Sequence, residues 1–304
     1  AVDKARFQIA ALINAKPNEI VFTSGGTEAN NLAIRGLFES LFRSRSLENA
    51  ATPHLITSTI EHPAVLNVCE DLQKRGCDVT YLPIGESGVV RTKDIEDAIT
   101  QRTFLISVMT VNNEIGTIQP VEEIGRLIRN FRDDRRKIWF HTDAVQAAGK
   151  LPVDVEEIGC DLLSLSAHKI HAPKGIGALY VRRGVRLQAQ TLGGRQERGL
   201  RGGTEPVAQI VAFGKAAELA GERLATLSTQ LRLLRDRFED KIFESITDVH
   251  RNGDRAGRVA NISNLSFGSI EGEALLINLD MKGIAVSTGA ACSSGSLEPS
   301  PVIR

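Results

Sequence analysis

Short apolar runs alternate with longer amphipathic segments along the first two thirds of the chain. The apolar runs are rich in β-branched residues and have the length of buried strands, whereas the segments between them repeat apolar residues at helical spacing. Strands alternating with helices predict an α/β fold with a mainly parallel central sheet and helices on both faces. The predicted strands are 19–23, 54–59, 78–84, 103–110, 137–143, 161–166 and 178–181, and the predicted helices include 27–41, 64–76 and 121–131.

The pattern changes near Pro206, where a long, charged helical repeat begins and continues to about residue 244. A helix of this length often bridges two domains, because one core does not cover it along its whole length. A predicted strand at 258–269 and a predicted helix at 271–283 follow it. We therefore expect a boundary near residue 215, which separates a large domain, 1–215, from a smaller C-terminal α+β domain, 216–304.

Composition narrows the classes of partner. The 304 residues include 37 Lys plus Arg and 37 Asp plus Glu, so no global field favours nucleic acid or a membrane surface. We see no uncharged apolar run of about 18 residues and no apolar core of a signal peptide at the start. Four cysteines without a CxxC pair indicate neither a disulfide framework nor a zinc ribbon, and they favour a reducing cytoplasm. These are Cys69, Cys77, Cys160 and Cys292.

Polar residues follow several predicted strands at their carboxyl ends, where ligands bind in parallel α/β sheets. The first such segment, SGGTE at 24–28, leads from a strand into a helix. Its backbone N–H groups and the Thr27 hydroxyl can surround a phosphate at the positive end of the helix. A plain helix N-cap is the alternative, because glycine turns before helices are common.

Two later strand ends carry an acid and an amine. Asp143 ends the 137–143 strand, where a buried carboxylate would pair with a cationic ring nitrogen or merely cap the next segment. Lys169 follows the 161–166 strand, where desolvation favours Schiff-base chemistry, unless its ammonium only reaches to water. His168 and His171 form an HxxH, but no further ligand stands at metal spacing, so we predict no metal site.

A phosphate loop, a strand-end carboxylate and a strand-end amine are together the contacts that pyridoxal phosphate needs. The phosphate binds amides and hydroxyls, the pyridine nitrogen binds a carboxylate, and the aldehyde binds an amine. Their co-occurrence in one chain is more specific than any one of them.

The motifs at these positions also resemble a known family, the cysteine desulfurases, which are fold type I, class V aminotransferase-like pyridoxal phosphate enzymes. The resemblance is collinear from about Pro17 to Ile303. The segments that carry it are FTSGGTEANNLAIRG, EHPAVLNVC, VNNEIGTIQP, HTDAVQAAGK, SAHKIHAPKGIGALYVRRG, GGRQERGLRGGTEPV and GAACSSGSLEPSPV.

The resemblance implies roles around the cofactor ring. Lys169 would bond the aldehyde, Asp143 would pair with the pyridine nitrogen, and Gln146 would hydrogen-bond the phenolic oxygen. His62 would stack on the ring and move protons, and Asn113 would lie near the substrate carboxylate and the cofactor. Without the resemblance, His62 would be a helix-start or core-edge histidine, and the VNNE segment a turn.

The resemblance also implies how the phosphate is held. Gly26, Thr27, Ser166 and His168 would contact it in one subunit. Thr204 would reach it from the second subunit of a homodimer.

The glycine- and serine-rich segment around Cys292 matches the family's mobile nucleophile loop. The resemblance implies that L-cysteine is converted to L-alanine while Cys292 takes the sulfur as a persulfide. An iron–sulfur scaffold or a tRNA-thiolating protein would then receive it. An incidental surface thiol is the alternative from the residues alone, and Cys69, Cys77 and Cys160 are expected only to pack.

The chain departs from the family pattern in three places. The family's N-terminal segment and its C-terminal segment with a substrate-binding arginine lie outside the sequence, so we expect the chain as written to bind substrate poorly. The polar stretch 42–53 indicates a longer surface loop than the family pattern has.

Two alternative functions remain open at this point. A selenocysteine lyase would use the same cofactor and a similar cysteine loop, although SLEPSPV and RGGTEPV favour the desulfurase. A non-catalytic scaffold would keep the fold alone, although Lys169, Asp143, Gln146 and Cys292 argue against it.

Overall fold

The computed structural model describes residues 1–42, 52–132, 137–289, 300 and 302–303. The predicted 42–53 loop and the segment around Cys292 therefore lie almost wholly outside the described residues.

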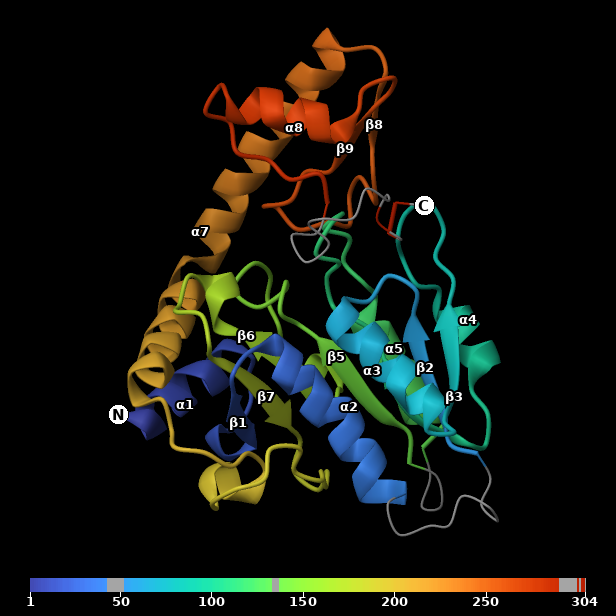
Figure 1. The fold of residues 1–304 in the computed structure, drawn as a ribbon, viewed down its shortest axis with the longest axis vertical. Coiled ribbons are helices and arrows are strands. Elements are labelled where there is room, and N and C mark those ends of the chain that lie inside the picture. The colour runs from blue at the N-terminus through green and yellow to red at the C-terminus, as the bar shows by residue number, and fades with distance from the viewer. Residues whose placement is uncertain (43–51, 133–136, 290–299, 301, 304) are drawn as a thin grey trace.

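A seven-stranded sheet forms the centre of the molecule, in the order β1-β7-β6-β5-β4-β2-β3 (Figure 1). Strands β6, β5, β4, β2 and β3 run parallel, while β7 runs antiparallel to both of its neighbours, β1 and β6. The strands are β1 (Ile20–Thr23), β2 (His54–Ser58), β3 (Asp78–Leu82), β4 (Thr103–Ser107), β5 (Trp139–Asp143), β6 (Leu162–Ser166) and β7 (Gly177–Val181).

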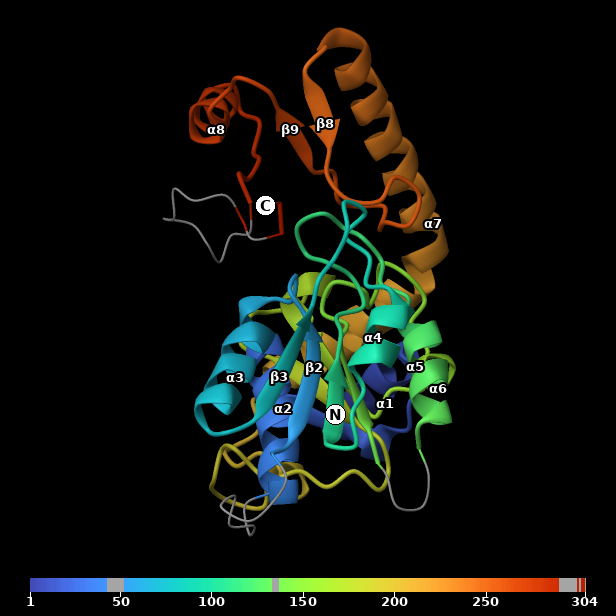
Figure 2. The ribbon, with the colours of Figure 1, turned by 90° about the vertical axis from the view of Figure 1, so that its right-hand side faces the viewer.

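Helices cover both faces of this sheet (Figure 2). Successive strand residues point to opposite faces, so Ile20 and Phe22 pack into one core with α1, α5 and α7, while Val21 packs into another with α2 and α3. Both faces are thus buried, as an almost wholly apolar strand requires. The helices are α1 (Val2–Leu12), α2 (Gly26–Phe42), α3 (Pro63–Lys74), α4 (Thr92–Ala98), α5 (Val121–Asn130), α6 (Val155–Ile158) and α7 (Val207–Ser245), with 3-10 turns at η1 (Pro17–Glu19), η2 (Ala167–Ile170) and η3 (Gln196–Gly199).

The long helix predicted after Pro206 is α7, and it carries the C-terminal part of the chain away from the sheet (Figure 1). Its first turns pack against α1 so closely that a Cβ on Gly214 would lie 2.5 Å from the Cα of Ala5. In the part of α7 that follows Ala217, Glu239 is the one described residue that is buried. The start of α7 therefore packs against the large domain, whereas its far half is mostly exposed. We propose on this basis that the chain divides into 1–215 and 216–304. The remaining elements are β8 (Val249–Arg251), β9 (Leu265–Phe267) and α8 (Gly272–Asp280).

A buried carboxylate joins the far half of α7 to the segment that follows it. Glu239 accepts hydrogen bonds from Arg258 at 2.6 Å, from Arg251 at 2.8 Å and from Ser263 at 2.8 Å. Burial opposes ionisation, but these donors outweigh it and lower the pKa of Glu239 to about 2. The predicted strand at 258–269 is consequently shorter than expected: its first residues form a loop around Glu239, and only Leu265–Phe267 pair with β8.

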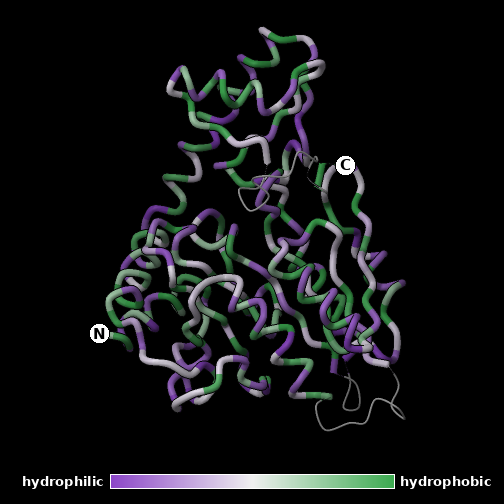
Figure 3. The backbone as a smooth tube through the Cα atoms, viewed as in Figure 1, coloured by the Kyte–Doolittle hydropathy of each residue, from purple (hydrophilic) through white to green (hydrophobic). Residues whose placement is uncertain are grey.

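The far half of α7 and α8 keep apolar side chains at the surface. The tube in Figure 3 changes repeatedly between green and purple along both helices, and α8 has no buried residue among those described. Within the described part of the chain, no helix is long and apolar enough to cross a membrane.

Candidate active site

The polar loops predicted from the sequence meet at one edge of the sheet, where β1, β2, β4, β5 and β6 have their carboxyl ends. His62 follows β2, Asp143 ends β5, and Lys169 lies in η2 after β6. The charges of Asp143 and Lys169 both act on the imidazole of His62. Three side chains from a stretch of more than a hundred residues thus interact electrostatically at one place in the fold.

Asp143 is buried, with 6% of its surface exposed, and its hydrogen bonds come from neutral donors. The Asn30 side-chain amide donates to Oδ2 at 2.7 Å, and the Val145 backbone N–H donates to Oδ1 at 2.9 Å. Burial raises the pKa of Asp143, although these bonds and the nearby His62 and Lys169 oppose the rise. Asp143 therefore does cap the following turn, as the simpler hypothesis required, but it also keeps a poorly compensated carboxyl group at the site.

His62 is the N-cap of α3, and its Nδ1 accepts the backbone N–H of Ala64 at 3.0 Å. The helix-start interpretation is thus correct for one ring nitrogen. Because Nδ1 is an acceptor, the neutral ring carries its proton on Nε2. Burial lowers the pKa of His62, Lys169 lowers it further and Asp143 opposes the shift, so the neutral ring is favoured.

Lys169 is half-buried, and its charge acts on Lys150 and His168. Burial lowers the pKa of Lys150 to about 8, and the charge of Lys169 adds to this effect. Lys150 donates to Oε1 of Gln146, one turn away in sequence. A lysine can only donate, so this contact turns the amide oxygen of Gln146 toward Lys150 and leaves its NH₂ group for another acceptor.

The predicted phosphate contacts gather around the start of α2. A Cβ added to Gly26 would lie 2.8 Å from Cγ2 of Val145 and 3.5 Å from Cβ of Ser166, so only glycine lets the helix start approach these residues. The Ser166 hydroxyl and Nδ1 of His168 are 2.9 Å apart, and Thr27 is exposed. Burial and the neighbouring Lys169 lower the pKa of His168.

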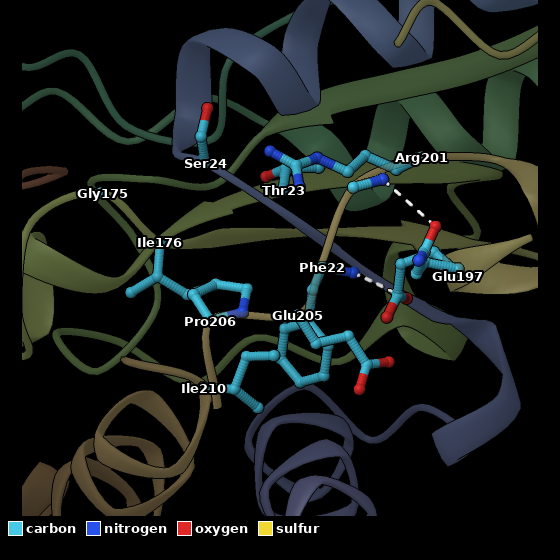
Figure 4. Close-up of a pocket in the computed structure, with 12 residues that line it drawn as sticks. Phe22, Thr23, Ser24, Gly175, Ile176, Glu197, Arg201, Glu205, Pro206 and Ile210 are labelled. Atoms are coloured by element: carbon cyan, nitrogen blue, oxygen red, sulfur yellow. Dashed lines mark hydrogen bonds between the residues drawn. The ribbon is translucent and has the colours of Figure 1, made fainter. Parts of the chain in front are cut away.

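Thr204 lies on an exposed loop that begins near Arg201. Arg201 pairs with Glu28 of α2 at 2.9 Å, and Glu28 also accepts the Ser24 N–H at 2.7 Å. These contacts tie the Thr204 loop to the predicted phosphate loop. A pocket beside them has Arg201 and Glu197 on one side and Ile176, Pro206 and Ile210 on the other (Figure 4). It does not include Asp143 or Lys169 in its lining.

Asn113 is half-buried in the loop after β4. Its neighbour Asn112 forms the turn that the VNNE segment predicted, since its Oδ1 accepts the N–H groups of Glu114 and Ile115 at 2.8 and 3.0 Å.

Three residues of this edge were missed in the sequence: Asn30, Glu61 and Lys150. Asn30 stands at a helical position like any other polar residue of the pattern, and its burial against Asp143 is a tertiary fact. Glu61 offered a signal, because it lies beside His62 after an apolar strand.

The predicted nucleophile Cys292 lies outside the described residues, so its position relative to Lys169 is not given by the structure. Cys69, Cys77 and Cys160 are free and buried, and burial raises the pKa of each thiol, to about 12 for Cys77. Among the residues with described positions, no group of three or more His, Cys, Asp or Glu side chains could hold a metal ion.

Comparison with known proteins identifies the family. The family model Aminotransferase class-V matches residues 1–303. The chain therefore belongs to the class-V aminotransferase family.

The curated relatives are more specific. The chain is 47% identical over 303 residues to the cysteine desulfurase IscS of Dictyoglomus turgidum, covering all of this chain and 74% of that protein. It is also 47% identical over 306 residues to the cysteine desulfurase of Homo sapiens, covering 64% of that protein. These matches confirm the resemblance stated from the motifs.

Solved structures agree on the fold. A NifS-like protein superposes with a TM-score of 0.87 at 36% identity, covering 94% of this chain and 75% of that one. The structure titled "SspA in complex with cysteine" gives a TM-score of 0.82 at 40% identity, covering 99% of this chain and 81% of that one. The predicted α/β fold of the pyridoxal phosphate type is thereby confirmed.

Proposed function

We propose that this chain is a pyridoxal phosphate-dependent cysteine desulfurase, which converts L-cysteine to L-alanine and transfers the sulfur to its own Cys292. The observation that carries the proposal is the placement of His62, buried Asp143 with its neutral donors, and Lys169 after the carboxyl ends of three parallel strands. The cysteine desulfurases that match all of this chain support it.

The residues at the sheet edge fit the cofactor. A buried carboxyl group whose hydrogen bonds come from neutral donors suits a protonated pyridine nitrogen, which supplies both a donor and a positive charge. A side chain at Gly26 would collide with Val145, and the position faces the hydroxyl of Ser166. The first N–H groups of α2 have no partner within their own helix, as anion sites at helix starts require.

Each predicted residue then has a role. Lys169 would hold the aldehyde, Asp143 the pyridine nitrogen, and the NH₂ group of Gln146 the phenolic oxygen. Gly26, Thr27, Ser166 and His168 would hold the phosphate. When bound, the cofactor supplies an electron sink that labilises the substrate's Cα proton and activates its sulfur.

The chain's own groups handle protons and substrate. His62, favoured as the neutral ring, would lie against the cofactor and move a proton through Nε2. Lys169 would give up its place to the substrate amine and would then serve as a nearby base. Asn113 would contact the substrate carboxylate.

Cys292 would accept the sulfur. Its thiolate attacks the sulfur of the substrate, a new S–S bond forms, and the C–S bond breaks, so that L-cysteine plus an enzyme thiol gives L-alanine plus an enzyme persulfide. The small residues around Cys292 would let the loop reach the substrate and then an acceptor.

The proposal includes partners and a location. Thr204 would complete the phosphate site of the second subunit in a homodimer, which suits its exposure. An iron–sulfur scaffold or a tRNA-thiolating protein would take the persulfide sulfur. Free thiols at Cys69, Cys77 and Cys160 suit a reducing compartment such as the cytoplasm.

Alanine release from L-cysteine tests the function, with Cys292→Ser as the diagnostic variant. The loaded wild type should release alanine, and Cys292→Ser should stay yellow but lose that activity. Retained turnover in Cys292→Ser with selenocysteine would favour a selenocysteine lyase. No turnover of either amino acid by the loaded wild type would contradict the proposal and favour a scaffold.

A further inference from the structure

A buried carboxyl group joins two loops of the candidate site. Glu61, which is 3% exposed, precedes His62. Its Oε1 accepts the hydroxyl of Ser58 at 2.6 Å and the backbone N–H of Met109 at 2.9 Å. Ser58 ends β2 and Met109 lies in the loop after β4, so a single carboxyl oxygen links the two strand ends.

A second link, like that of Met109, donates from the loop after β4 to the loop after β2. The side-chain amide of Asn112, in the loop after β4, donates to the carbonyl oxygen of Ile60 at 3.0 Å. The first loop ends at His62 and the second continues to Asn113. The two loops that would contact the cofactor ring and the substrate are therefore joined by two separate hydrogen bonds.

We propose that Glu61 is a positioning residue, whose carboxyl group fixes the loop of His62 against the loop of Asn113 and so fixes the His62 ring at the site. The inference rests on the proposed function, because it gives His62 its task. The hydrogen bonds that Glu61 accepts come from Ser58 and Met109, not from the ring of His62. Its effect is transmitted through the backbone of residues 59–62.

Glu61 acts in its neutral form. Burial raises the pKa of Glu61 to about 8, and Asp143 on β5 adds to the rise, while Ser58 and the Met109 N–H oppose it. The thiol of Cys69 on α3 also lies near it, and burial keeps that thiol protonated by raising its pKa. Among the described residues, Oε2 has no hydrogen-bond partner, so no donor stabilises a negative charge on that oxygen.

The neutral form makes glutamine a matched replacement. In Glu61→Gln, the amide oxygen accepts the same two hydrogen bonds at the same reach. In Glu61→Leu, the volume is similar, but the Ser58 hydroxyl and the Met109 N–H lose their shared acceptor. Comparing the two variants distinguishes the effect of the hydrogen bonds of Glu61 from the effect of its side-chain volume.

The experiment measures His62 directly in the cofactor-loaded full chain. The protein has six histidines, so long-range ¹H–¹⁵N spectra can resolve each ring, and a His62→Gln spectrum identifies the signal. Wild type and Glu61→Gln should show the Nε2–H tautomer, because Nδ1 accepts the Ala64 N–H. Glu61→Leu should show a mixture of tautomers and a pKa nearer the ordinary value.

Steady-state alanine formation gives the second readout. Misplacement of a catalytic group by about 1 Å costs roughly a hundredfold in rate, so Glu61→Leu should lower kcat by about ten- to a hundredfold with a smaller change in KM. Glu61→Gln should recover kcat to within about threefold of the wild type. Asp161→Asn, which alters a buried carboxylate at the opposite edge of the sheet, is the control for general loss of stability and should leave the His62 spectrum unchanged.

The inference is overturned if Glu61→Leu keeps the wild-type tautomer, whatever its kcat, or if Asp161→Asn changes the His62 spectrum equally. Should Glu61→Leu fail to fold, Glu61→Met removes the same acceptor with an unbranched side chain of similar length, and a wild-type tautomer in that variant also overturns it. A wild type that forms no alanine refutes the proposed function, while the tautomer comparison still decides whether Glu61 positions His62.

Discussion

Two buried aspartates at opposite edges of the same sheet have opposite surroundings. Asp161, just before β6 at the amino edge, is 2% exposed and accepts the Arg132 guanidinium and the Phe140 N–H, the latter at 2.8 Å. Asp143, at the carboxyl edge, accepts neutral donors from Asn30 and Val145. Burial raises the pKa of both, and the arginine opposes the rise at Asp161.

The difference separates a structural carboxylate from one suited to a ligand. An arginine at hydrogen-bonding distance gives Asp161 a partner of opposite charge in the folded protein. Asp143 has donors that orient it without neutralising it, so a cationic ligand gains most by binding there. The comparison shows that burial of an acid is uninformative until its donors are known.

The largest expected effect comes from replacing each aspartate by asparagine. Asp143→Asn should lower alanine formation by about 10²-fold or more, because a neutral amide does not stabilise a positive ring nitrogen, while the free energy of unfolding changes by about 1 kcal/mol or less. Asp161→Asn should instead lower the free energy of unfolding by about 3 kcal/mol, because Arg132 loses its partner. Kinetics and urea unfolding of both variants check this. Equal effects of both variants on alanine formation would contradict the assignment of Asp143 to ligand binding and of Asp161 to stability.

The next effect concerns the phosphate side of the carboxyl edge. Gly26→Ala would place a methyl group 2.8 Å from Val145 and toward Ser166, so the loaded protein should release the cofactor about tenfold more readily. A Cβ on the adjacent Gly25 meets nothing within 4 Å, which makes Gly25→Ala the matched control. Equilibrium dialysis of the cofactor measures both. A larger loss in Gly25→Ala would show that the crowding at Gly26 is irrelevant.

The pH dependence of stability should differ in sign between an arginine-bound and an isolated carboxyl group. Arginines hold the pKa of Glu239 at about 2, below the 4.5 of an ordinary glutamate. Its contribution to the free energy of unfolding is therefore fully present above pH 4.5 and is lost as the pH falls toward 2. Urea titrations of the wild type and Glu239→Gln between these pH values measure it. A slope that is the same in both would argue against the ion-pair assignment.

Glu61 should show an effect of opposite sign. Its pKa is raised to about 8, so the unfolded chain ionises first, and the folded state loses stability as the pH rises from about 4.5 to 8. Glu61→Gln removes this titration and should flatten the curve in that range. If the variant keeps the wild-type slope, Glu61 is ionised in the folded protein at neutral pH.

Much of the fold could be predicted from local patterns. The length and β-branched content of the apolar runs predicted the seven strands of the central sheet within a few residues, but they missed β8 and made β9 too long. Helical spacing predicted α2, α3, α5, α7 and α8. The pattern did not reveal α1, because its apolar and polar residues show no clear helical spacing. This helix is stabilised by packing against α7, which lies about two hundred residues later in the chain. Nor did it reveal that β7 runs antiparallel, because strand direction depends on the path of the intervening chain.

The candidate site was predictable where one residue type implies one chemistry. Lys169 and Asp143 stand at strand ends, and parallel strands bring those ends together. Asn30 and Glu61 were missed because their importance depends on what they contact after folding. Cys292 was predicted from sequence alone, and its place in the site stays a prediction.

The central claim is that the carboxyl edge of the sheet holds the cofactor through Lys169. Borohydride reduction of the loaded protein fixes the cofactor to whichever amine holds it, and peptide mass analysis then locates that amine. We predict that Lys169 carries the cofactor and that Lys150 and Lys174 do not. Cofactor attached to Lys150 or Lys174, or to no lysine in a protein that binds it, would contradict the account.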